Sequence, residues 1–171
     1  MCLAYGLVMY EAILILSRQQ ILHIKWSTKL TTHWILQGTV VLLATVGFLV
    51  IYQSKISKGK NHFETLHAKL GLATLIATLV QAVGGLCAKY PKLMKKQLRP
   101  LTVKTLHRLA ACITFNLGCI SLITGLFSNW FLDQMADSNP WWKGLAALPP
   151  VMGVIIVLQV LKSFLPYFKK K

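Results

Sequence analysis

The stretch 31–38, Thr-Thr-His-Trp-Ile-Leu-Gln-Gly, is the strongest indication of the fold in this sequence. It places His33 at the start of an apolar run that is long enough to cross a bilayer. Two later stretches repeat the arrangement, Thr-Leu-His-Ala-Lys around His67 and Thr-Leu-His-Arg-Leu around His107. Each stretch predicts one histidine in the first turn of an apolar helix. Three such histidines in succession indicate a candidate ligand set.

The composition is that of a membrane protein. Of the 171 residues, 55% are hydrophobic, which indicates that the outside of the protein is apolar as well as its core. The net charge of +15 comes from 19 Lys and Arg against four Asp and Glu. In a soluble protein this charge would indicate nucleic-acid binding. Here the charges lie between apolar runs and are not interleaved with aromatic residues, so we expect no nucleic-acid partner.

Five apolar runs predict five membrane-spanning helices in a single domain, with four of them forming the core of an all-α, multi-pass bundle. A proline pair, Pro149-Pro150, is expected to kink the last helix or to shift its start. The four cysteines lack metal-ligand spacing and are expected to be structural. The runs are residues 1–17, 33–53, 66–88, 106–127 and 145–165.

The basic residues predict an orientation for the bundle. Thirteen Lys and Arg lie in the first and third connectors and in the C-terminal tail counted together with Lys162, whereas four lie in the second and fourth connectors. By the positive-inside rule the C-terminus is cytoplasmic. His33 and His107 then lie at the cytoplasmic level and His67 at the opposite face. Two histidines on one side of the membrane are therefore expected to meet.

Two imidazoles that face each other inside a helix bundle are suited to bind a haem iron axially. Gly71 and Ala111, each four residues after a histidine, would leave room for a porphyrin, but Gln37 breaks this pattern after His33. The alternative is that all three histidines lie at the interface and are satisfied by water and backbone. Zinc is less convincing, because no His, Cys or carboxylate set has the spacing of a tetrahedral site. Motifs for nucleophilic hydrolysis and for phosphate binding are absent from the sequence.

The chain resembles the cytochrome b561 family. The resemblance rests on Met-Tyr-Glu-Ala-Ile-Leu in the first run, on His33-Trp34 at a helix start, on His67 thirty-four residues later and on His107 forty further, with Gly-Leu-Cys-Ala-Lys-Tyr-Pro-Lys between the last two histidines. The resemblance covers nearly the whole chain and is strongest to the smaller proteins of the family, the cytochrome b561 domain-containing proteins. It implies six helices with two b haems, which pass electrons from cytoplasmic ascorbate to ferric iron or monodehydroascorbate. The five runs of this chain would be helices two to six.

Carried over to this sequence, the resemblance implies that His33 and His107 are the axial pair of the cytoplasmic haem and that His67 is one ligand of the other haem. No histidine stands where the family has its fourth, in the run that begins at Met1, and the family's first helix has no counterpart. We expect residues upstream of Met1, because the first run reaches only about 25 Å. One or two haems are therefore expected.

The resemblance also implies that ascorbate, an anion, is a partner. The candidates to bind it are basic residues close in sequence to the two cytoplasmic histidines, namely Lys25, Lys29 and Arg108. Membrane lipid, an endomembrane or vesicle location and a homodimer are further expectations. Two other classes stay open. One is a structural or regulatory membrane protein without a cofactor. The other is a small transporter, which is the weakest rival because the runs contain few polar residues.

Overall fold

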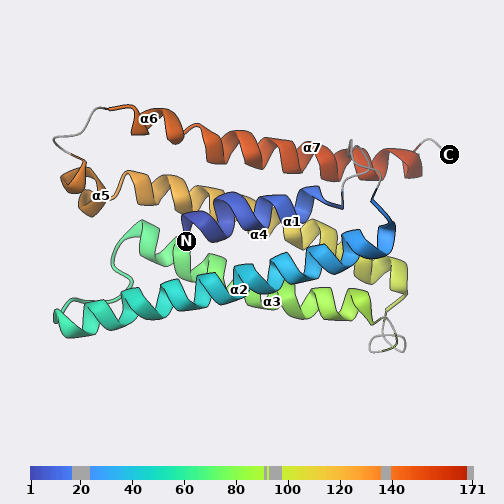
Figure 1. The fold of residues 1–171 in the computed structure, drawn as a ribbon, viewed down its shortest axis with the longest axis horizontal. Coiled ribbons are helices and arrows are strands. Elements are labelled where there is room, and N and C mark those ends of the chain that lie inside the picture. The colour runs from blue at the N-terminus through green and yellow to red at the C-terminus, as the bar shows by residue number, and fades with distance from the viewer. Residues whose placement is uncertain (17–23, 91, 93–97, 136–139, 169–171) are drawn as a thin grey trace.

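The structure is a computed structural model that describes residues 1–16, 24–90, 92, 98–135 and 140–168. These residues form helices joined by short connections, and none of them lies in a strand. In chain order the elements are a π-helical segment, η1 (Leu3–Met9), followed by α1 (Tyr10–Leu14), α2 (Trp26–Ser57), α3 (Leu66–Lys89), α4 (Pro100–Leu126), α5 (Asn129–Gln134), α6 (Trp142–Leu145) and α7 (Leu148–Phe168) (Figure 1).

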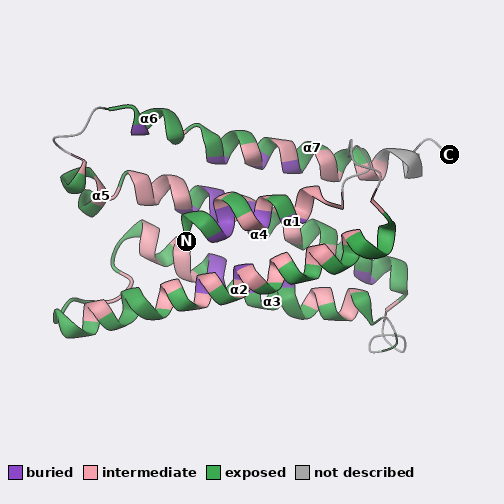
Figure 2. Ribbon diagram, in the orientation of Figure 1, coloured by how far each residue is buried: buried purple, intermediate pink, exposed green. Residues whose placement is uncertain are grey.

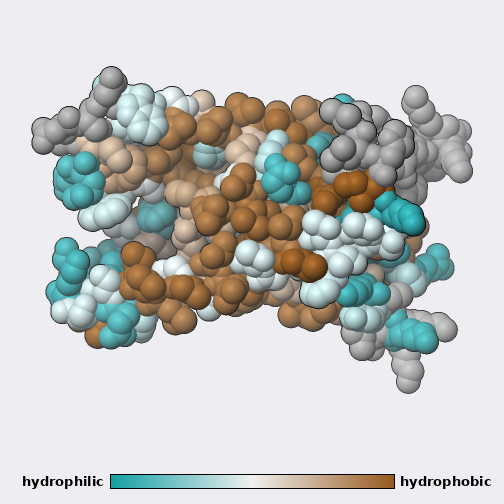
Figure 3. All heavy atoms as spheres, viewed as in Figure 1, coloured by the Kyte–Doolittle hydropathy of each residue, from teal (hydrophilic) through white to brown (hydrophobic). Residues whose placement is uncertain are grey.

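Four helical segments of the described chain are long and apolar enough to cross a membrane. They are Trp26–Ser57, Leu66–Lys89, Pro100–Leu126 and Trp142–Phe164. The first of the five predicted spans is a shorter apolar helix over Leu3–Leu14. Apolar side chains cover the middle of the bundle and hydrophilic ones gather at its two ends (Figure 3). The all-α, multi-pass bundle expected from the sequence is confirmed.

The short first segment, η1 with α1, lies against α2, α4 and α7 and supplies much of the buried core (Figures 1 and 2). Tyr10 stacks on the fully buried Phe115 of α4, with ring centroids 5.9 Å apart. Lipid is as apolar as a leucine side chain, so burial of apolar surface does not drive membrane helices together. Close packing of this kind stabilises their association instead. The buried residues of this segment are Ala4, Tyr5, Met9 and Ala12.

Two helices begin earlier than the apolar runs predict. Helix α2 starts at Trp26, so the polar connector expected up to residue 32 was too long. Helix α4 starts at Pro100, where the fixed φ of proline suits the first helical position. The backbone hydrogen bonds of a helix are made within the helix, so a helix can extend beyond the apolar run that crosses the membrane. Its first residue is then set by local signals such as this proline. His33 and His107 therefore each lie two turns inside their helices, whereas His67 is in the first turn of α3 as predicted.

The proline pair marks the start of the last long helix. Pro149 and Pro150 are the second and third residues of α7, where a missing backbone N–H breaks no intrahelical hydrogen bond. The short helix α6 precedes them, with Trp142 buried against Phe127 and Phe131. Of the two outcomes expected for the proline pair, the shifted helix start is the one observed.

The close contact between α4 and α7 leads us to predict that a larger residue at position 153 lowers the stability of the fold. An added Cβ at Gly153 would lie 2.5 Å from Asn116 Oδ1, and the Asn116 amide also donates to the Cys112 carbonyl oxygen over 2.9 Å. We expect Gly153→Ala to force the Asn116 side chain away and to be less stable than Gly38→Ala by about 1 kcal/mol. Gly38 is the control, since nothing lies within 4 Å of its added Cβ. Equal thermal stability of the two purified variants would contradict this.

Candidate functional site

The side chains of His33 and His107 meet at one end of the bundle, although they come from different helices. Their ring centroids are 6.5 Å apart and their planes are nearly perpendicular, at 86°. His33 belongs to α2 and His107 to α4, and each lies seven residues after the start of its helix. The equal depth of the two residues is what allows them to face each other.

The separation of the two rings fits a metal ion held between them. An imidazole nitrogen lies about 1.1 Å from its ring centroid, and metal–nitrogen bonds are about 2.0–2.1 Å, so an axial pair has centroids roughly 6.3 Å apart. The observed 6.5 Å agrees with this arrangement. Among the described residues, no group of three or more His, Cys, Asp or Glu is placed to hold a metal ion. A site made of two imidazoles suits an ion whose other ligands come from a macrocycle.

His33 is oriented by the backbone of the first segment. Its Nδ1 donates to the carbonyl oxygen of Ala12 over 2.6 Å, since a carbonyl oxygen can only accept. Ala12 is fully buried, so this acceptor is shielded from water. A ligand histidine commonly donates its second ring N–H to such an acceptor, which leaves Nε2 free for the metal. The surroundings of His33 therefore fit a ligand role.

His107 is held by α3. The Gln81 amide nitrogen lies 3.0 Å from His107 Nδ1 and 2.7 Å from the His107 carbonyl oxygen. An added Cβ at Gly84 would lie 3.6 Å from His107 Nδ1, and one at Gly85 would lie 3.3 Å from Cε1. The sequence predicted small residues one turn after His67 and His107, on the same helix as each histidine. The glycines that border this ring instead come from the facing helix.

His67 lies toward the other end of the bundle in similar surroundings. Its Nδ1 donates to the Ser121 carbonyl oxygen over 2.9 Å, and an added Cβ at Gly125 would lie 2.9 Å from its Cε1. The rise of about 1.5 Å per residue along α3 separates His67 from Gln81 by about 21 Å. The described residues provide no histidine ring in contact with His67. The structure thus pairs His33 with His107 and leaves His67 apart from them.

The three basic residues suggested for ascorbate do not share one environment. Lys25 immediately precedes α2, and Lys29 lies one turn before His33 on the same helix. Arg108 follows His107 but is directed toward α7, where its Nη1 donates to Ser163 Oγ over 3.0 Å. Lys25 and Lys29 therefore lie at the end of the bundle that holds the histidine pair, whereas the Arg108 guanidinium is engaged elsewhere.

Sequence reasoning missed several contributors to this site. Gln81 and the Ala12 carbonyl carry no motif, because their contacts with the histidines span 26 and 21 residues of sequence. Lys89, at the end of α3, has its Nζ 4.5 Å from the centre of the Trp34 ring, next to His33. The Gly84-Gly85 pair was a usable signal, since two adjacent glycines in a membrane helix permit a close approach.

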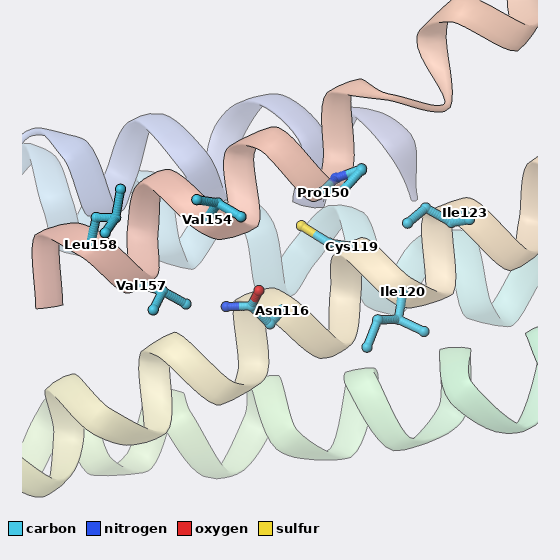
Figure 4. Close-up of a pocket in the computed structure, with 8 residues that line it drawn as sticks. All are labelled: Asn116, Cys119, Ile120, Ile123, Pro150, Val154, Val157 and Leu158. Carbon is cyan, nitrogen blue, oxygen red and sulfur yellow. The ribbon is translucent and has the colours of Figure 1, made fainter. Parts of the chain in front are cut away.

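The cavity between α4 and α7 is separate from the histidines. It has a volume of about 330 Å³ and an almost wholly apolar lining, with the Asn116 side chain as its polar member (Figure 4). None of the three histidines lines it. The lining residues are Asn116, Cys119, Ile120, Ile123, Pro150, Val154, Val157 and Leu158.

Comparison with known proteins identifies the family of the chain. Residues 1–132 match the sequence model of the family described as eukaryotic cytochrome b561. The mouse and human transmembrane reductases CYB561D2 are each 31% identical to the chain over 173 residues, which is 99% of this chain and 76% of theirs. The probable transmembrane reductase CYB561D1 of mouse is 31% identical over 168 residues, 97% of this chain and 72% of its own length. The chain belongs to the cytochrome b561 family.

Proposed function

We propose that this protein is a haem b-dependent transmembrane reductase, which takes electrons from ascorbate on the cytoplasmic side and delivers them to ferric iron or monodehydroascorbate on the opposite face. The observation that carries the proposal is the His33–His107 pair, whose 6.5 Å separation suits two axial imidazoles. Membership of the cytochrome b561 family and the similarity to proteins named transmembrane reductases support it.

The contribution of this chain at the histidine pair is to hold and shield the iron ligands. His33 and His107 would bind the iron of a haem, which supplies one-electron chemistry when it is present. Two imidazole ligands would leave the iron no free position for oxygen, so the haem would supply electron transfer rather than oxygen chemistry. The Ala12 carbonyl and the Gln81 amide hold the two rings in place. His67 would serve a second haem near the other face, with Ser121 orienting it.

The cytoplasmic assignment of the paired histidines follows from charge. The start of α2, the end of α3 and the start of α4 lie at their end of the bundle and carry Lys25, Lys29, Lys89 and Lys104, and the positive-inside rule assigns such charge to the cytoplasmic side. Ascorbate is an anion that loses a proton together with an electron, so positive charge attracts it to this end of the bundle. This orientation also makes the C-terminus cytoplasmic. An endomembrane or vesicle membrane is the location proposed.

A structural or regulatory role without a cofactor is the second candidate. It is favoured by the fact that all three histidines already have a hydrogen-bonding partner on a neighbouring helix, at Ala12, Ser121 and Gln81. Buried imidazoles satisfied in this way need no metal to explain them.

The test is a reduced-minus-oxidised absorption spectrum of the full chain in detergent, with ascorbate and then dithionite as reductants, together with the ratio of haem to protein. A haem-to-protein ratio near two supports electron transfer across the membrane through two haems, with a further ligand that completes the His67 site. A haem-to-protein ratio near one supports a single haem at the His33–His107 pair. A folded protein without haem would overturn the proposal and favour the structural role.

The basic residues near the pair give a separate prediction. We expect the double variant Lys25→Gln/Lys29→Gln to raise the KM for ascorbate by roughly 3- to 10-fold through weaker attraction of the anion. Reduction by dithionite should be unchanged. The matched control is Lys58→Gln/Lys60→Gln, which removes the same charge from exposed residues at the opposite end. An equal rise in KM for both pairs would show that only the overall charge matters.

A further inference from the structure

Gln81 gives His107 a different hydrogen-bonding partner from those of the other two histidines in the candidate set. Those two each donate from Nδ1 to a backbone carbonyl oxygen, at Ala12 and at Ser121. The neighbour of His107 Nδ1 is instead the Gln81 amide nitrogen, 3.0 Å away. We infer that this amide holds His107 in the tautomer that does not bind iron, so that Gln81 opposes ligation at the histidine pair. The inference rests on the proposed function, because it concerns how that same site is filled.

The tautomer follows from the atoms involved. The Gln81 nitrogen also lies 2.7 Å from the His107 carbonyl oxygen, which can only accept, so the amide nitrogen and not the amide oxygen occupies this position. An amide nitrogen donates and does not accept, so its hydrogen bond with Nδ1 requires an unprotonated Nδ1. The neutral ring then carries its proton on Nε2. A protonated ring nitrogen has no lone pair to offer to a metal ion.

The unprotonated Nδ1 of His107 cannot serve as the ligand in place of Nε2. Added Cβ atoms at Gly84 and Gly85 would lie 3.6 Å from this Nδ1 and 3.3 Å from Cε1 of the same ring. The backbone of α3 therefore borders the Nδ1 edge of the ring, and no room remains there for a haem. Ligation by His107 requires a lone pair on Nε2 and hence a proton on Nδ1.

Reversal of the Gln81 amide does not provide for that change. It would place Oε1 where the nitrogen lies, 2.7 Å from the His107 carbonyl oxygen, and two acceptors at this distance repel each other. The amide must therefore leave its present position before Nδ1 can carry a proton. Gln81 is only 8% exposed, and a buried amide in a membrane helix is costly when its hydrogen bonds are lost. The present contacts thus stabilise the tautomer that does not ligate.

His33 needs no such change. Its Nδ1 donates to the Ala12 carbonyl oxygen at 2.6 Å, so its Nε2 is unprotonated and free to ligate. The pair therefore joins one ring that is ready to bind a metal ion and one ring that must first exchange protons. In that exchange His107 loses a proton from Nε2 and gains one at Nδ1, so the ring stays neutral. We expect His33 to bind first and His107 to follow.

The first experiment measures the tautomer independently of haem. The full chain, labelled with 15N at histidine and purified from haem-deficient cells, is studied by NMR in detergent at a pH of about 8, where an ordinary imidazole is neutral. The variants His33→Ala and His107→Ala assign the signals. Protonated and unprotonated ring nitrogens have well separated 15N shifts. We expect an unprotonated Nδ1 in His107 and a protonated Nδ1 in His33. A protonated Nδ1 in His107 would overturn the inference.

The second experiment measures how strongly Gln81 opposes ligation. Haemin is titrated into the full chain and into Gln81→Met, and the absorption band that His107→Ala lacks is followed. Methionine has a similar length and makes no such hydrogen bond. We expect half-saturation at a haemin concentration roughly 3- to 10-fold lower in Gln81→Met, which corresponds to one hydrogen bond that no longer has to be broken. Gln81→Leu serves as a second variant without the amide.

The matched control is Thr78→Val, one turn earlier on α3. It removes a buried hydroxyl that lies 3.0 Å from Tyr5 Oη, and we expect half-saturation at the parent concentration. Haemin binding by both Gln81 variants that is no tighter than in the parent, or an equal gain in Thr78→Val, would overturn the inference. If neither the parent nor any variant binds haemin, the proposed function fails. The 15N spectrum then decides the inference alone, since an unprotonated His107 Nδ1 supports it and a protonated one overturns it.

Discussion

Replacement of His33 or of His107 by alanine is expected to abolish the same haem absorption band almost completely. The two rings lie 6.5 Å apart and would share one iron, so the loss of either removes an axial ligand of the same group. His67→Ala should leave this band in place, since His67 lies on α3 about 21 Å from Gln81, the residue that contacts His107. The measurement is the reduced-minus-oxidised spectrum of each purified variant.

His62→Ala provides the control for the loss of a histidine. His62 lies in the connection between α2 and α3, where its ring stacks on Tyr52 with centroids 4.2 Å apart. This variant should keep the full spectrum. Free imidazole should partly restore the band in His33→Ala and His107→Ala, because it can occupy the vacated axial position. If the two variants lost different bands, the rings would not share one iron.

A valine at position 118 is expected to destabilise the bundle by about 1–3 kcal/mol. An added Cβ at Gly118 would lie 3.1 Å from Tyr5 Cδ1 and 3.5 Å from Thr74 Cγ2, at the meeting point of η1, α3 and α4. The Tyr5 ring cannot easily retreat, because its hydroxyl group is hydrogen-bonded to Thr78 Oγ1 at 3.0 Å. The measurement is the midpoint of thermal unfolding in detergent, which should fall by several degrees.

Gly38→Val makes the comparison specific to packing. Gly38 also lies inside a membrane helix, so both substitutions change the helix propensity in the same way, but nothing lies within 4 Å of an added Cβ at Gly38. Gly118→Val should therefore unfold at a clearly lower temperature than Gly38→Val. Similar midpoints for the two variants would mean that the first segment is not packed against α4 as tightly as described.

Helices α3 and α4 use the same arrangement at both ends. His67, at the start of α3, borders Gly125 near the end of α4, and His107, early in α4, borders Gly85 near the end of α3. Two antiparallel helices bring the start of each beside the end of the other, so a histidine early in one helix faces a glycine late in the other. This explains why the small residues next to the rings lie on the facing helix.

Several properties of this protein could be predicted from the sequence because they depend on local composition. The hydrophobic content and the long apolar runs indicate a membrane bundle, since each run must satisfy its own backbone in lipid. The spans around α3 and α7 agree with the structure to within a few residues. The spacing of His33, His67 and His107 places each histidine toward an end of its span, and alternating direction puts the first and last of them on one side.

Only the tertiary structure decided which groups surround these histidines. The Ala12 carbonyl, the Gln81 amide and Gly125 reach the three rings from other helices, and no pattern along the chain encodes such contacts. Arg108 adjoins His107 in sequence, yet its side chain points to Ser163 of α7. Periodicity along a helix determines which residues share a face, whereas the neighbour of that face depends on how the helices pack. The membrane class and the ligand candidates are thus sequence properties, and the geometry that pairs His33 with His107 is a property of the packed bundle.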